Sequence, residues 1–115
     1  MDISFKQKKL EKCVSDEAKL QKEFGRFARN VQMRLSVLRQ ARSLADISHT
    51  PPMRRHKLES RKDVFAFAVD VKTKEDSLRI EFEVANNPLP LKPGGELDFE
   101  AVTAIEITKI SNHYE

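Results

Sequence analysis

The stretch Met53-Arg-Arg-His-Lys-Leu-Glu-Ser-Arg-Lys-Asp-Val-Phe-Ala-Phe-Ala-Val-Asp-Val71 joins a basic segment to an alternating apolar run. Bulky apolar side chains stand at positions 65, 67, 69 and 71, and two alanines and Asp70 stand between them. This period of two is typical of a β-strand, because successive side chains point to opposite faces of the sheet. The stretch therefore predicts a strand over 64–71 that is preceded by a cluster of cations.

A histidine lies within that cluster. His56 is surrounded in the sequence by cations that we take as candidate RNA or phosphate ligands, namely Arg54, Arg55, Lys57, Arg61 and Lys62. Cations bind phosphate, and an imidazole can transfer a proton near neutral pH. The pattern therefore favours RNA cleavage as a hypothesis. The alternative is that His56 only forms a hydrogen bond within the fold.

Length and composition limit the class of protein. The chain has 115 residues, 39% of them hydrophobic and 34% charged, which is typical of a single small domain over residues 1–115. No apolar run reaches the roughly 20 residues of a membrane span, and the N-terminus lacks a signal-peptide pattern. We therefore expect a cytoplasmic protein that does not bind a membrane.

The single Cys13 is expected to be a buried apolar side chain, and the histidines lack metal-ligand spacing, so we expect no metal and no cofactor.

The net charge of +3 conceals an asymmetry along the chain. Residues 1–62 contain 16 Lys and Arg against 7 Asp and Glu, whereas residues 63–115 contain 5 against 11. A basic half favours a polyanion or an acidic protein as partner. The cations of the long helix alone are better explained as its solvent face, but the cluster at 54–62 lies outside that helix.

The rest of the chain predicts an α+β fold. We expect a first strand over 2–5, a short helix over 6–14, and a long helix that is capped by Ser15 or Asp16 and continues to about Leu44. A loop ending at Pro51-Pro52 follows, then strands over 64–71, 78–84 and 102–110, with an irregular connection over 86–100. This order indicates two N-terminal helices packed on one face of a small, mainly antiparallel sheet.

The same alternation places candidate catalytic residues on the other face. The apolar residues of strand 78–84 must face the helices, so Arg79 points to the uncovered face, where His56 and the C-terminal tail can also arrive. Hydrolysis of RNA by its own 2′-OH requires a base, an acid and cations on the phosphate. His56 and His113 could share the proton transfers, Tyr114 could donate or position, and Arg79 could stabilise the phosphate. Alternatively, Arg79 pairs with a neighbouring glutamate, and the tail is only a disordered end.

Several segments, taken together in order, resemble the HigB-like branch of the RelE/ParE toxin superfamily. They are Leu10-Glu11-Lys12 with the long basic helix, Leu44-Ala45-Asp46-Ile47, Pro51–Leu58, Arg61-Lys62, Leu78–Phe82, Ala85–Pro90 and Val102–Ile107. The resemblance implies a RelE/ParE-like fold and a toxin of a type II toxin–antitoxin module. It implies a ribosome-dependent mRNA interferase, an endoribonuclease that cuts translated mRNA without a metal. It also implies a partner, a cognate antitoxin of the HigA-like, helix-turn-helix kind.

The resemblance carries two site residues over directly. His56 falls where similar toxins have an active-site histidine, and Arg79 where they have a phosphate-contacting arginine. Glu59 stands where similar toxins often have lysine, and the tail Asn112-His113-Tyr114 differs from their usual Asp-Tyr-His order. Two other readings therefore stay open. One is a ParE-like gyrase poison without enzymatic activity, and the other is a catalytically weakened toxin-fold protein that acts through its antitoxin partner.

Overall fold

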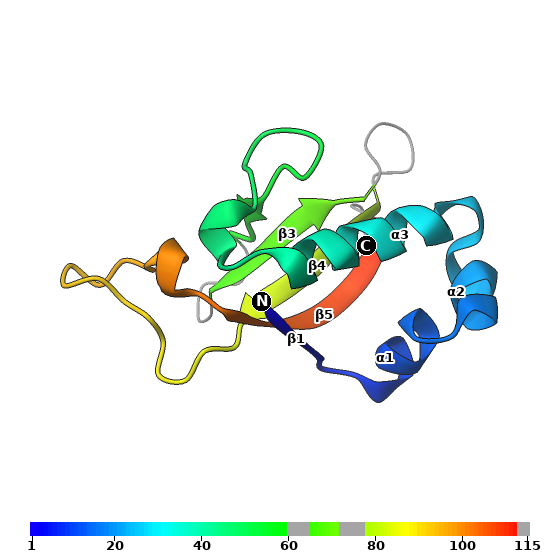
Figure 1. Cartoon of the computed structure of the whole chain (residues 1–115), viewed down its shortest axis with the longest axis horizontal. Helices are drawn as coiled ribbons and strands as arrows, with labels where there is room; N and C mark the ends of the chain where they lie inside the picture. The colour runs from blue at the N-terminus through cyan, green and yellow to red at the C-terminus, as the bar shows by residue number, and fades with distance from the viewer. Residues whose placement is uncertain (60–64, 72–77, 113–115) are drawn as a thin grey trace.

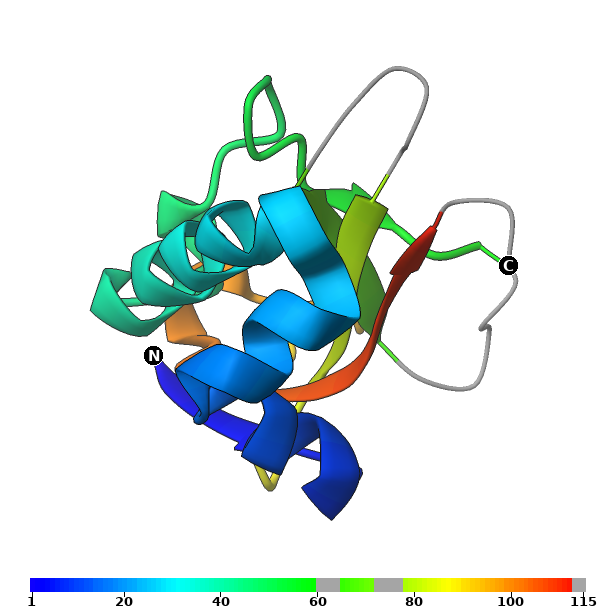
Figure 2. The same ribbon diagram turned by 90° about the vertical axis from the view of Figure 1, so that its right-hand side faces the viewer.

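The chain forms one sheet with helices on one side of it (Figures 1 and 2). The computed structural model describes residues 1–59, 65–71 and 78–112. The five strands of the sheet are β1 (Asp2–Phe5), β2 (His56–Lys57), β3 (Ala66–Asp70), β4 (Leu78–Val84) and β5 (Ala104–Asn112). Their spatial order is β1-β5-β4-β3-β2, which leaves β1 and β2 at the two edges.

The sheet is mixed rather than wholly antiparallel. The pairs β2–β3, β3–β4 and β4–β5 are antiparallel, as the sequence predicts for a mainly antiparallel sheet. Strand β1 instead pairs in parallel with β5, with Ile3 opposite Ile105. A register shift between Glu81 and Phe82 interrupts the β4–β5 ladder. The expected α+β class is confirmed.

The helical region differs from the expectation. The described residues form α1 (Lys8–Val14), α2 (Glu17–Phe24), the short 3₁₀ helix η1 (Gly25–Phe27) and α3 (Ala28–Gln40). The single long helix from residue 16 to about Leu44 is therefore wrong. Gly25 adopts φ +54° and ψ −126°, a conformation that side-chain-bearing residues avoid, and it ends α2. The expected N-cap is confirmed, because the Asp16 side chain accepts a hydrogen bond from the Lys19 N–H at 3.1 Å.

The apolar stripe of these helices packs on the sheet despite the break. Leu20, Val31, Leu35 and Leu38 are buried in the main core, and Phe24 and Phe27 pack against it. Figure 1 shows α3 lying across the sheet. The sheet contributes Phe67, Val69 and Val71 together with the expected inward set of β4. This face of the sheet, which packs on α3, is called the proximal face below.

The opposite face, here called the distal face, contains Ala66, Ala68 and Asp70 of β3. Both alanines are fully buried beside Leu58, and Asp70 is buried as well. Every residue of β3 is thus buried, and the alternation in 65–71 assigns its two faces correctly. Two short 3₁₀ helices lie outside the sheet. They are η2 (Leu44–Asp46), which follows α3, and η4 (Phe99–Ala101), which precedes β5. No helix among the described residues is long and apolar enough to cross a membrane.

The conformation of Gly25 provides a test of the helix break. We expect Gly25→Ala to lower the free energy of unfolding by about 1–3 kcal/mol, because a side chain is strained at this φ and ψ. Chemical denaturation followed by circular dichroism measures the change. Gly94→Ala is the matched control, since the added methyl would meet only the carboxylate end of Glu96. Equal stabilities of the two variants would contradict the assigned break.

Candidate functional site

The distal face presents two rows of side chains across the strands. The first row runs from β2 to β5 through directly opposed residues, namely His56, Ala68, Glu81 and Lys109. In the second, Asp70, Arg79 and Ser111 lie opposite one another. Directly opposed residues in antiparallel strands share a face. The structure therefore brings His56 and Arg79 to the same face, separated by β3, or about 10 Å between their strands.

His56 is held by a backbone carbonyl. Its Nδ1 lies 2.8 Å from the carbonyl oxygen of Arg54. Because a carbonyl only accepts, Nδ1 must carry the proton in this contact, and in the neutral ring Nε2 keeps its lone pair. Nε2 is buried and has no hydrogen-bond partner among the residues that the structure describes. A buried, unpaired ring nitrogen is unusual, and it makes His56 the strongest candidate for a proton acceptor.

Arg54 supplies that carbonyl from a strained backbone. Its φ is +44°, which is uncommon for a residue with a side chain. Two hydrogen bonds hold its guanidinium on Asp70, from Nε to Oδ2 at 2.6 Å and from the terminal nitrogen to Oδ1 at 3.1 Å. The hydrogen bond to Asp70 raises the pKa of Arg54 above its usual value, although burial opposes the effect. Arg54 therefore acts in the described structure as an anchor for the His56 loop.

Arg79 is oriented by an acid on its own strand. Its Nε donates to Oε2 of Glu81 at 3.1 Å, and the two side chains are only 15% and 9% exposed. The two residues are neighbours on one face of β4, because they are two positions apart. The pairing with a neighbouring glutamate that the sequence left open is thus present. It fixes the direction of the guanidinium, which has five N–H groups in total.

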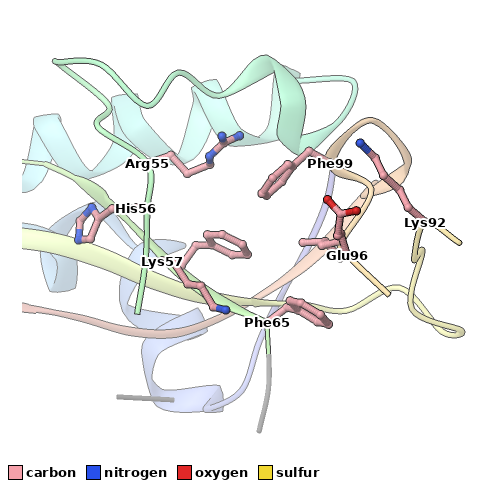
Figure 3. A pocket seen from close by; sticks show the side chains of 9 residues that line it. Arg55, His56, Lys57, Phe65, Lys92, Glu96 and Phe99 are labelled. Atoms are coloured by element: carbon pink, nitrogen blue, oxygen red, sulfur yellow. The ribbon is translucent and has the colours of Figure 1, made fainter. Parts of the chain in front are cut away.

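The other described cations of the cluster belong to the proximal face. Arg55 directly precedes β2, and Lys57 follows His56 on it. Alternation therefore directs both cations away from the imidazole, and Figure 3 shows the ring of His56 apart from them. The Arg55 guanidinium lies 4.4 Å from the centre of the Phe99 ring and donates to the Leu44 carbonyl at 2.9 Å. Burial lowers the pKa of Arg55 from its ordinary value, but arginine stays charged at neutral pH.

The remaining predicted residues cannot be placed on either face. Arg61, Lys62, His113 and Tyr114 lie outside the described residues. Sequence reasoning missed two contributors to the region. Asp70 on the distal face was identified only as a polar strand position. Phe99 begins the 3₁₀ helix η4, which sequence pattern alone does not bring to β2.

Cys13 differs from its expected environment. It is half-buried rather than buried, and its thiol contacts the Lys19 carbonyl at 3.7 Å. Burial, together with Glu23 and Asp16, raises the pKa of the thiol, and Lys19 opposes this. A raised pKa disfavours the thiolate, so Cys13 is a poor nucleophile at neutral pH.

No protein-family model, no curated protein and no solved structure matches this chain. The candidate site therefore depends on its own geometry and on the resemblance described above.

The first prediction concerns the tautomer of His56. We expect the neutral ring to carry its proton on Nδ1, because the Arg54 carbonyl accepts from that atom. Long-range ¹⁵N–¹H NMR at alkaline pH distinguishes the tautomers, and the exposed His49 is the internal control. His56→Gln assigns the signal. A ring protonated on Nε2 would contradict the geometry.

The second prediction concerns the Arg54–Asp70 pair. We expect a double-mutant cycle with Arg54→Ala and Asp70→Ala to give a coupling of about 1.5–3 kcal/mol in unfolding free energy. The reason is that Asp70 is buried and that its hydrogen bonds with Arg54 join two charged groups. Urea denaturation measures it. The exposed Arg42–Asp46 pair is the control, at no more than about 0.5 kcal/mol. A similar coupling in both pairs would show that Arg54 is not an anchor.

Proposed function

We propose that this chain is the toxin of a type II toxin–antitoxin module and an mRNA interferase of the HigB-like branch of the RelE/ParE superfamily. One observation carries the proposal. His56, with its proton held on Nδ1 and its Nε2 unpaired among the described residues, shares the distal face with Arg79. These are the two positions that the sequence resemblance assigns to catalysis.

The chemistry follows from the roles that these groups can take. Nε2 of His56 would accept the proton of the 2′-OH, and the resulting oxygen would attack the adjacent phosphorus. The bond to the leaving 5′-oxygen would then break, which yields a 2′,3′-cyclic phosphate and a 5′-hydroxyl end. The guanidinium of Arg79, directed by Glu81, would stabilise the charge on the phosphate. His113 and Tyr114 are the candidates for the acid that protonates the leaving oxygen.

The burial of Nε2 sets a condition on this mechanism. The atom is not accessible to solvent in the described conformation. The proposed mechanism therefore requires that Nε2 becomes accessible when RNA binds, so that the 2′-OH can reach His56.

The fold and the partners belong to the same proposal. We assign α1 as the first helix of the superfamily and α2 with α3 as its second, broken helix, packed on one face of the sheet. The proposed partners are translated mRNA, the ribosome and a HigA-like antitoxin with a helix-turn-helix domain. We favour cleavage over gyrase poisoning, because a gyrase poison has no need of an imidazole with a fixed tautomer.

The function is tested by substitution of the two catalytic candidates. We expect induced expression of the unmodified chain to arrest bacterial growth, and His56→Ala and Arg79→Ala each to relieve the arrest. The expected loss of RNA cleavage is roughly 10²–10⁴-fold for His56→Ala, the usual contribution of a general base. The measurement is growth together with cleavage of a translated message.

Matched variants control for lost charge and lost imidazole. His49→Ala and Arg42→Ala change exposed residues outside the strands of the sheet and should stay toxic. Thermal melting and antitoxin binding show that each variant folds. Full toxicity of both His56→Ala and Arg79→Ala would remove the proposed site.

A further inference from the structure

A hollow of about 450 Å³ lies on the proximal side of the sheet, beside the edge strand β2. Its walls come from segments that are far apart in sequence, namely β2 and the start of β3 on one side and the 92–99 loop on the other. Figure 3 shows Phe65, Phe99, Glu96 and Lys92 around it. His56 also lines the hollow, but Figure 3 shows its ring directed away from these four side chains, none of which the catalytic proposal uses.

The hollow presents flat surfaces. The Arg55 guanidinium covers the Phe99 ring, and Phe99 in turn packs edge-on to Phe67, with ring centres 5.7 Å apart. Phe65 is half-buried and lies 6.0 Å from the Lys57 ammonium. Aromatic rings and guanidinium planes are the surfaces on which nucleobases stack.

The hollow is also cationic. Among the residues that the structure describes, its lining includes the cations Arg55, Lys57 and Lys92 against the single carboxylate of Glu96. Among the described residues, the Lys92 and Glu96 side chains form no ion pair. A neutral apolar ligand would leave the cations unused, and a bare anion would leave the flat surfaces unused. A ligand that has both a flat ring and a negative charge matches the lining.

We propose that this hollow binds one nucleotide of single-stranded RNA. The base stacks on Phe65 and on the Arg55 guanidinium, and the phosphate lies near Lys57 and Lys92. Glu96 accepts a hydrogen bond from an exocyclic amine, as a carboxylate does from cytosine N4. The site therefore prefers amine-bearing bases to uracil.

The position of the hollow relates it to the candidate cleavage site. Strand β2 is one edge of the sheet, and it presents His56 to the distal face and Lys57 to the proximal face, where the preceding Arg55 also lies. RNA that crosses this edge contacts both faces. The bound base is then a neighbour of the cleaved position. This relation rests on the proposed function, whereas binding of a nucleotide to the hollow does not.

The test is NMR titration of the ¹⁵N-labelled whole chain with each ribonucleoside 5′-monophosphate. We expect the amides of residues 55–57, 65 and 96–99 to shift, and CMP to bind more tightly than UMP. Ribose 5-phosphate and inorganic phosphate are the controls for the phosphate alone. Equal shifts with these controls would overturn the proposal in favour of a simple anion site.

Three substitutions sharpen the test. Phe65→Ala should weaken CMP binding roughly 5- to 150-fold, the range for loss of one stacked base. Because Phe65 also packs against the core, exposed Glu96→Gln is the second variant; it should keep the fold and abolish the preference for CMP over UMP. Arg42→Ala, which removes an exposed cation elsewhere, should leave binding unchanged.

The outcomes separate this inference from the proposed function. Arg79→Ala, at a catalytic candidate that does not line the hollow, should retain nucleotide binding there even though it loses cleavage. Cleavage that depends on His56 without any nucleotide-induced shift at the hollow would overturn this inference alone. Shifts with N-acetyl-aspartyl-phenylalanine amide but with no nucleotide would assign the hollow to a protein partner and also overturn it.

Discussion

Burial of β3 on both of its faces is the constraint on which the rest of the structure depends. Its large side chains complete the core beneath α3, and its alanines and Asp70 form the floor of the distal face. A shift of one residue in its register would exchange the two sets and place Asp70 in the core. The same register sets His56 opposite Ala68 and Arg79 opposite Asp70. The core and the candidate site are therefore fixed by one strand.

The distal face balances its cations with buried acids. Arg54 is held by Asp70, and Arg79 by Glu81, and both acids are buried. Such pairs keep long side chains in one geometry at the expense of part of their attraction for phosphate. On the other side of β2, Arg55 and Lys57 lie against aromatic rings and form no ion pair with any of the described residues. The basic cluster of the sequence is thus divided between two faces. On the distal face Arg54 is paired with an acid, and on the proximal face Arg55 and Lys57 lie against aromatic rings.

Local pattern predicted four of the five described strands, and the face of each residue in β3 and β4, because a period of two is visible over five to seven residues. It did not predict the break at Gly25, since a glycine inside an apolar stripe is compatible with a continuous helix until its φ is known. Nor did it predict the parallel pairing of β1 with β5, which joins segments about a hundred residues apart. The separation of Arg55 and Lys57 from His56 was predictable from alternation, but the short β2 was not recognised as a strand.

Cleavage of RNA at the distal face is the proposed activity, and the ends of cut messages test it most directly. The measurement is mapping of mRNA 5′ ends after induced expression, with a gyrase supercoiling assay on the same cells. If the distal face cleaves RNA, we expect new 5′-hydroxyl ends within translated messages, paired with 2′,3′-cyclic phosphates, and normal supercoiling. Intact messages in growth-arrested cells with inhibited gyrase would contradict it and indicate a poison of the ParE kind. Intact messages in healthy cells would instead leave a protein that acts only through its partner.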